Sequence, residues 1–134
     1  MKNKYLVFRL KPGDDLLQKI IENCVKKHLN SAAIISAVGC VKEARFRKAD
    51  GKTVHQEIKD FEVTSLSGTI SNDGPHIHIQ LCDNKLRSIG GHLTTGTIVN
   101  TTMEIVLLNL ENEYRLTREF DESTGYDELV VKKI

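Results

Sequence analysis

Three histidines lie close together along the chain in a pattern that could bind a metal ion. In the segment HIHIQL, residues 76–81, polar and apolar residues alternate, so a strand here would direct His76 and His78 to one face and the isoleucines to the other. A third histidine, His92, follows the pair Gly90–Gly91, which frees the backbone to adopt conformations closed to other residues. A hairpin between the two segments would bring the three imidazoles together.

Three imidazoles with one coordination position left open are a recognised zinc arrangement. Residues two apart on a strand have Cα atoms about 6.6 Å apart, and their rings can converge on an ion about 2.0–2.1 Å from each nitrogen. The spacing is therefore permissive, and a pair of partly exposed histidines on a solvent face is the alternative. Cys82 has the same alternation phase and is an alternative fourth ligand, although it lies four and six residues from the two histidines of the strand.

Two glutamates are candidates to assist such an ion. A bound zinc lowers the pKa of its water towards 7, and a carboxylate within reach would act as a base or orient a ligand. The candidates are Glu62 and Glu104. Glu104 lies inside the apolar stretch MEIVLLNL, where it either faces solvent or is a buried carboxylate beside Arg45 or the histidines, because an unpaired buried charge is costly.

Composition describes one soluble domain with an aliphatic core. The 134 residues are enough to bury a core without disulfides, 40% are apolar and none is tryptophan. Lysine and arginine (19) nearly balance aspartate and glutamate (18), so no long-range field would attract nucleic acid or an anionic membrane. Without a bilayer-length apolar run or a secretory signal, the chain is expected to be cytoplasmic, with its cysteines reduced.

The segments that would position these residues are mostly strands. Apolar residues from Leu16 to Leu29 follow the helical period, which predicts an amphipathic helix of about four turns that Asp14 caps and Asn30 ends. The chain carries no Gly-rich phosphate loop, nucleophile elbow or Cys-x-x-Cys pair. Strands are expected at residues 4–10, 31–38, 40–48, 61–70, 76–81, 97–110, 114–117 and 129–131.

A short basic segment offers a second kind of surface. Arg45 and Arg47 share one side of a strand, and Lys48 and Lys52 follow them. Together they are a candidate surface for phosphate contacts to DNA, although a run of charges is more simply a solvated strand face.

Four segments together resemble the PPC domain, named for plants and prokaryotes conserved. They are AIISAVGCVKEARFRKADG at 33–51, FEVTSLSGTI at 61–70, HIHI at 76–79 and GGHL at 90–93. The last three match sequence blocks of that family in order and in approximate spacing. Each block alone is weak, but three in register across nearly the full length make the resemblance specific.

The resemblance implies a fold, an assembly and a site. It predicts a single domain over residues 1–134 of the α/β (α+β) class, in which a largely antiparallel β-sheet is flanked by a long N-terminal helix, and it predicts a homotrimer. In stand-alone prokaryotic members the three histidines look like a metal site, so His76, His78 and His92 inherit that role by position. Zinc is the expected ion, because nothing here supplies the oxygen-rich shell of magnesium or calcium.

Plant members of this family differ in ways that bear on DNA binding. There the domain follows an AT-hook, and a segment around the residue equivalent to Phe61 contacts transcription factors. This chain has no Arg-Gly-Arg-Pro core, and Lys59–Asp60 replace the plant Gly-Arg pair. Direct DNA binding of the AT-hook type is therefore not expected, whereas Phe61 and Arg45 stay candidates for contact with a ligand or a partner.

These observations predict a zinc-binding, trimeric protein with a regulatory or small-ligand-binding role, associated with DNA through partners. Two alternatives stay open. The first is a zinc-dependent enzyme that uses a metal-activated water, and the second is a protein that binds DNA directly through its basic segment. Whether the chain is an enzyme is left open by the sequence.

Overall fold

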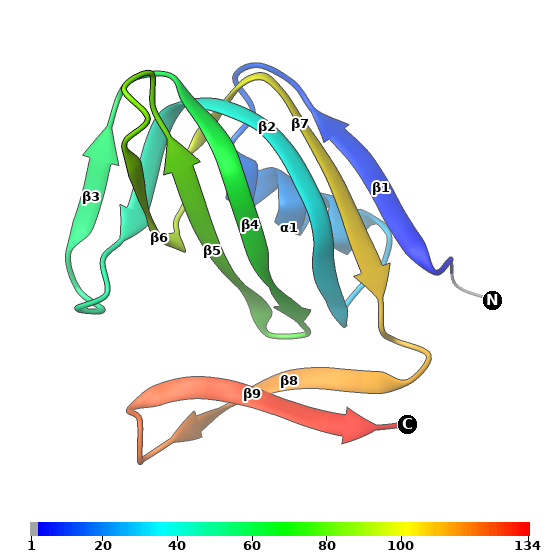
Figure 1. The fold of residues 1–134 in the computed structure, drawn as a ribbon. Coiled ribbons are helices and arrows are strands. Elements are labelled where there is room, and N and C mark those ends of the chain that lie inside the picture. The colour runs from blue at the N-terminus through cyan, green and yellow to red at the C-terminus, as the bar shows by residue number, and fades with distance from the viewer. Residues whose placement is uncertain (1–2) are drawn as a thin grey trace.

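The computed structural model describes residues 3–134, which form one helix, α1 (Leu16–Lys26), and nine strands. Figure 1 shows a strongly curved sheet with α1 behind it and a separate two-stranded hairpin across its lower end. The strands are β1 (Tyr5–Leu10), β2 (Ala32–Arg47), β3 (Val54–Glu57), β4 (Phe61–Ser71), β5 (Gly74–Cys82), β6 (Ser88–Leu93), β7 (Ile98–Asn109), β8 (Tyr114–Asp121) and β9 (Tyr126–Lys133).

The prediction of an α/β domain with a long flanking helix is wrong, because the described chain is mostly β-sheet. The helix has 11 residues and ends at Lys26. His28 adopts a left-handed conformation (φ 53°), its N–H donates to the carbonyl of Val25, and the N–H of Leu29 donates to that of Cys24. This is a Schellman motif, which stops a helix. Leu29 is nevertheless buried, and so the apolar period continues in the sequence after the helix has ended.

The start of α1 also differs from the prediction. The capping residue is Asp15 rather than Asp14, because the Asp15 carboxylate accepts the N–H of Gln18 at 3.0 Å. The other carboxylate oxygen of Asp15 accepts the N–H of Gly96 at 2.7 Å. The cap therefore also fixes α1 to the loop between β6 and β7.

β2 organises the sheet because it pairs with four other strands. The order is β1-β7-β2-β4-β5-β6, β3 pairs with β2, and every pairing in this sheet is antiparallel. β6 also pairs with the end of β2, so β2, β4, β5 and β6 close into a ring. β2 shifts register at Gly39 (φ +153°), where a Cβ would lie 2.0 Å from the carbonyl oxygen of Thr102. Only glycine fits at this bend.

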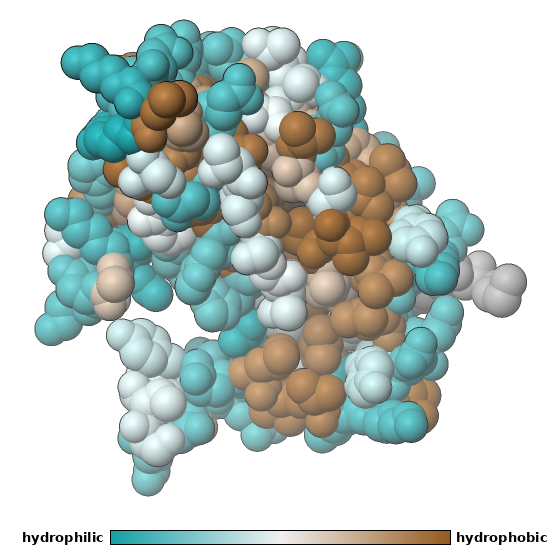
Figure 2. Space-filling model, viewed as in Figure 1, coloured by the Kyte–Doolittle hydropathy of each residue, from teal (hydrophilic) through white to brown (hydrophobic). Residues whose placement is uncertain are grey.

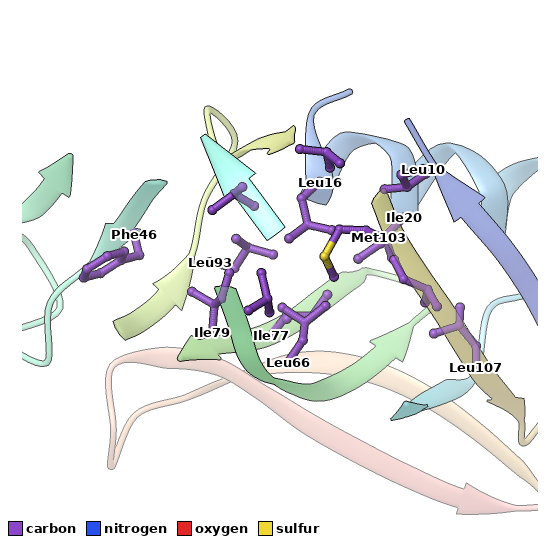
Figure 3. Packing of buried hydrophobic residues seen from close by; sticks show 14 of the residues in the cluster. Leu10, Leu16, Ile20, Phe46, Leu66, Ile77, Ile79, Leu93, Met103 and Leu107 are labelled. Atoms are coloured by element: carbon purple, nitrogen blue, oxygen red, sulfur yellow. The ribbon is translucent and has the colours of Figure 1, made fainter. Parts of the chain in front are cut away.

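The core fills two connected spaces. One lies between α1 and the sheet, where Leu16 and Ile20 pack near Met103, and the other lies inside the ring of strands (Figure 3). Each fully buried aliphatic side chain contributes roughly 1.5–3 kcal/mol to folding. The side chains inside the ring include Phe46, Leu66, Ile77, Ile79 and Leu93.

The opposite face of the sheet is partly apolar and uncovered. Tyr5 and Val7 alternate with core residues of β1, and Val38 lies opposite Glu104 across β2 and β7. Figure 2 shows hydrophobic side chains gathered over β1, β7 and β2 on the face turned away from α1. Within the described residues, the single helix is too short to span a membrane.

The C-terminal hairpin, β8–β9, forms a sheet of its own rather than extending the main one. The N–H of Asn72 in the β4–β5 turn donates to the carbonyl of Leu116, and the N–H of Leu116 donates to the hydroxyl of Ser31. Leu116 is buried, with 4% of its surface exposed. These contacts hold the hairpin across the end of β4 and β5 (Figure 1).

The turn between β5 and β6 is built around a buried carboxylate. One oxygen of Asp83 accepts the N–H groups of Lys85 and Arg87, each at 2.9 Å, and the other accepts Lys59 Nζ at 2.9 Å. The hydrogen bond from Lys59 is the main reason that the pKa of Asp83 lies well below its usual range. Asp83 thereby fixes where β6 starts.

We expect Asp83→Asn to unfold at a temperature several degrees lower than the wild type at pH 7, since the amide replaces a charged acceptor of several hydrogen bonds. A carboxylate whose pKa is lower in the folded protein than in the unfolded chain stabilises the fold at pH values above its ordinary pKa, 3.8. This contribution is lost as the pH falls through the pKa of the folded state. The gap in melting temperature should therefore narrow below about pH 4. Thermal unfolding between pH 7 and pH 2 measures it, and Asp60→Asn, at an exposed site, is the control.

Candidate metal centre

Strand pairing brings the three histidines into one cluster. His78 on β5 lies directly opposite His92 on β6, and His76 precedes His78 by two residues on the same face of β5. Ile77 and Ile79 point into the core instead. The alternation predicted from the sequence therefore places the imidazoles on the outer face of the ring of strands.

The spacing of the rings suits a shared ion. Ring centroids are 4.9, 5.3 and 5.8 Å apart, and one nitrogen from each of His76, His78 and His92 lies within 4.8 Å of the others. The Nε2 atoms of His76 and His78 are 3.2 Å apart. Two nitrogens about 2.05 Å from a tetrahedral ion lie roughly 3.3 Å apart. This pair is therefore at ligand spacing, and His92 offers a third nitrogen within 4.8 Å of the other two.

The twin glycines allow β6 to approach its neighbours closely. A Cβ on Gly91 would lie 2.4 Å from the carbonyl oxygen of Arg47, and one on Gly90 would lie 2.1 Å from that of Ile79. Neither glycine has a positive φ. The sequence suggested that this pair is needed for an unusual backbone conformation, and that reason is wrong. The two glycines are needed because β6, which carries His92, lies very close to β2 and β5.

The surroundings of two of the histidines favour neutral imidazoles. Burial is the main cause that lowers the pKa of His76 and of His92 below 6.5; the next causes are His78 and Arg118 for His76, and Arg47 for His92. Nδ1 of His92 is buried and has no hydrogen-bond partner. A neutral ring is the form that binds metals, and a ring nitrogen without a hydrogen-bond partner can use its lone pair to bind a metal ion. The residues present therefore fit a bound zinc ion.

The cluster opens on a small pocket between the sheet and the C-terminal hairpin. The volume of this pocket is about 270 Å³. His76 and His78 are exposed and His92 is half-buried, and His76 and His92 line this pocket, so the cluster is accessible from it. The lining residues are Arg47, Pro75, His76, His92, Arg118, Tyr126, Asp127 and Glu128.

The structure does not bring the two predicted carboxylates into the cluster. Glu62 is exposed and pairs with Cys82, four residues along β5 from His78. Glu104 is exposed on β7 and lies opposite Val38 of β2, with β4 between β2 and β5. Cys82 is a free thiol outside the histidine group. The roles predicted for the two glutamates have no support in this geometry.

The other two predicted contact residues also lie away from the pocket. Arg45 Nη1 donates to the carbonyl of Thr95 at 3.4 Å. Phe61 is only 2% exposed and lies in the core, with Lys59 Nζ 5.5 Å from the centre of its ring. The Phe61 ring is therefore a packing group, and its contact with a partner stays a prediction.

Sequence reasoning missed the residues that β8 and β9 supply. Arg118 on β8 and Asp127 and Glu128 on β9 line the pocket beside the histidines. No spacing in the sequence links them to residues 76–92, because the connection depends on where the hairpin docks. Of the two arginines that line the pocket, the sequence singled out only Arg47, as a residue on the same side of a strand as Arg45.

Comparison with known proteins places this geometry in a family. The sequence model of the Plants and Prokaryotes Conserved (PCC) domain matches residues 2–111. The match covers the main sheet and the three histidines, and it ends before β8 and β9.

Among curated proteins, the chain is similar to the bifunctional protein GlmU of Synechococcus sp. (strain JA-3-3Ab). The two are 38% identical over 126 residues, which is 94% of this chain and 20% of that protein. The chain therefore spans about a fifth of the length of this relative.

Solved structures share the fold over nearly the whole chain. A hypothetical protein from Salmonella enterica is 29% identical with a TM-score of 0.92, covering 96% of this chain and 93% of that one. A candidate DNA-binding protein from Ralstonia eutropha JMP134 is 25% identical (TM-score 0.78, 96% of each chain). A metal-containing protein from Archaeoglobus fulgidus is 29% identical (TM-score 0.74, 97% and 95%).

We expect Gly91→Ala to weaken zinc binding at least about tenfold, because a Cβ would push β6 from β2 and move His92. The same crowding should lower the free energy of unfolding by about 1–3 kcal/mol. Zinc titration against a competing chelator and denaturant unfolding measure the two effects.

The control is Gly13→Ala. Gly13 has a φ of +91° and open space around it, so this change costs about 1–2 kcal/mol through backbone strain at a site far along the chain from the histidines. Zinc affinity should be unchanged. Equal losses of zinc affinity in both variants would show that general destabilisation, and not the strand contact, controls the site.

Proposed function

We propose that this chain, which belongs to the Plants and Prokaryotes Conserved (PCC) domain family, binds a zinc ion through His76, His78 and His92 and holds a small ligand beside the open coordination position. The observation that carries the proposal is the convergence of three imidazole nitrogens from a single hairpin, within 4.8 Å of one another. A structurally similar protein from Archaeoglobus fulgidus is described as metal-containing, which supports it.

Zinc fits the donor set better than other common ions. All three donors are imidazoles, and within residues 3–134 no carboxylate belongs to the group. Magnesium and calcium need an oxygen-rich shell, whereas three imidazoles suit zinc. When bound, the ion would act as a Lewis acid towards a water or a ligand oxygen.

The chain's own residues would hold and shield the ligand. His76, His78 and His92 would orient the ion, and the C-terminal hairpin would cover one side of the pocket. The neutral state of the His76 and His92 imidazoles, favoured by burial and by nearby arginines, keeps these two ligands ready near neutral pH.

A regulatory role and assembly as a homotrimer stay predictions. The exposed apolar side chains of Tyr5, Val7 and Val38 offer a surface that assembly would bury. A structurally similar Ralstonia protein is a candidate DNA-binding protein, and the near balance of charge in this chain favours association with DNA through partners over direct contact.

A zinc-dependent enzyme is the second candidate. Glu128 lies close enough to His76 to raise the pKa of that ring, against the larger effect of burial, and it lines the same pocket. A carboxylate in this position could act as a base towards a metal-bound water. Glu128 is thus a better placed candidate base than Glu62 or Glu104.

Replacing any one of the three histidines by alanine should lower zinc affinity by more than about 100-fold, since loss of a direct ligand costs more than loss of a residue that only orients one. The measurement is the metal content of protein purified without a histidine tag, followed by zinc titration of the metal-free form.

His55→Gln is the matched control. His55 lies outside the cluster, with its Nε2 2.9 Å from Glu57 Oε1, so this variant should bind one zinc ion per chain like the wild type. Stoichiometric zinc in His76→Ala or His92→Ala would contradict the assignment of the site.

A further inference from the structure

We propose that Arg47 and Arg118 form an oxyanion-binding pair beside the histidine cluster, so that the ligand of the pocket is a small molecule carrying a carboxylate or a phosphate group. The inference deepens the proposed function and rests on it, because the zinc ion would supply the third positive group around the same anion. It is carried by the placement of the two guanidinium groups on either side of the histidines.

Arg47 extends the row of histidines by one strand. It lies directly opposite His92 across β2 and β6, as His92 lies opposite His78 across β6 and β5. Its Nε is buried and has no hydrogen-bond partner. A guanidinium has five N–H donors, and leaving one of them buried without an acceptor is costly. An oxygen of a ligand bound beside His92 would satisfy this donor.

Arg118 reaches the cluster from the C-terminal hairpin. Its backbone N–H donates to the Asp73 carboxylate at 2.8 Å, which fixes β8 to the β4–β5 turn. Its Nη2 donates to Thr69 Oγ1 at 3.4 Å, and Thr69 lies opposite His76 across β4 and β5. The guanidinium is thus anchored at the opposite side of the cluster from Arg47.

Neither guanidinium forms an ion pair with a carboxylate of the described residues. Among residues 3–134, no ion pair within 4.0 Å involves Arg47 or Arg118, although Asp127 and Glu128 line the same pocket. Both cations line the pocket that His76 and His92 also line, so their charges meet at the cluster. Adding a zinc ion would increase the positive charge there. An oxyanion is the ligand that offsets it, and arginine forks match carboxylate and phosphate geometry.

The shape of the pocket limits the ligand to a small molecule. Its volume, about 270 Å³, is below the roughly 300–1,000 Å³ of most drug-sized sites. A nucleic-acid duplex cannot enter it. Tyr126, Asp127 and Glu128 lie on the side opposite the sheet, where their oxygens would accept hydrogen bonds from hydroxyl or amino groups of the ligand.

The experiment titrates the cobalt-substituted protein with inorganic phosphate and, separately, with succinate, at constant ionic strength held with sodium chloride. Calorimetry reports binding, and the visible spectrum of Co²⁺ reports whether the anion reaches the metal. We expect at least one probe to bind and to change the spectrum. Arg118→Gln and Arg47→Gln should each weaken that binding about tenfold or more. Tighter binding of phosphate or of succinate identifies the headgroup.

Two further variants keep the test decisive. Arg118→Lys retains the positive charge but not the planar, two-pronged guanidinium, so it should bind the anion more weakly than the wild type. It also disturbs the fold less than Arg118→Gln, because the charge is kept. Arg115→Gln, on an exposed residue of the same strand, should bind both probes like the wild type. Binding of both probes to Arg118→Gln and Arg47→Gln with wild-type affinity, or no binding to the wild type, would overturn the inference.

Failure of the metal site gives a different result. If the protein takes up no zinc or cobalt, calorimetry with the metal-free form still tests the arginine pair. Anion binding that the arginine variants lose would then reject the zinc site and retain the oxyanion site. Stoichiometric metal with no anion binding would reject the oxyanion site alone. The arginine variants themselves should keep wild-type or higher metal affinity, since neither side chain is a ligand and both repel cations.

Discussion

The pairing of β6 with both β5 and β2 is the constraint on which the rest of the structure depends. It closes four strands into a ring around an aliphatic core and sets Arg47, His92 and His78 in one row. The isoleucines of β5 fill the inside of the ring, so the histidines between them must face outwards. The same pairing thus produces both the hydrophobic core and the candidate metal centre.

Much of the candidate site could be predicted from the sequence because it follows from local periodicity. Alternation along 76–81 fixes which side chains share a face, and the turn at Asp83 makes the hairpin that brings His92 back. The function of Gly90 and Gly91 could not be predicted in the same way. Their small size matters only once β2 and β5 lie on either side of β6, and that is a property of the closed ring.

The failures of prediction have physical causes that a single sequence does not display. The helix is short because His28 takes the left-handed conformation that usually belongs to glycine, while the buried Leu29 continues the apolar pattern beyond the end of the helix. Arg118 was missed because two hydrogen bonds between the hairpin and the β4–β5 turn decide where the hairpin docks: the N–H of Asn72 donates to the carbonyl of Leu116, and the N–H of Arg118 donates to the Asp73 carboxylate. Neither the left-handed residue nor the docking contact leaves a periodic signal.

The hairpin β8–β9 is a separate sheet, is attached through a few polar contacts and one buried leucine, and follows the segment that the family shares. The pocket therefore has two walls that are built separately: one is the main sheet with its imidazoles, and the other is the hairpin. Exchanging residues of the hairpin would leave the imidazoles in place and change the groups that meet the rest of the bound molecule. Ligand selectivity can in this way be altered without rebuilding the histidine cluster.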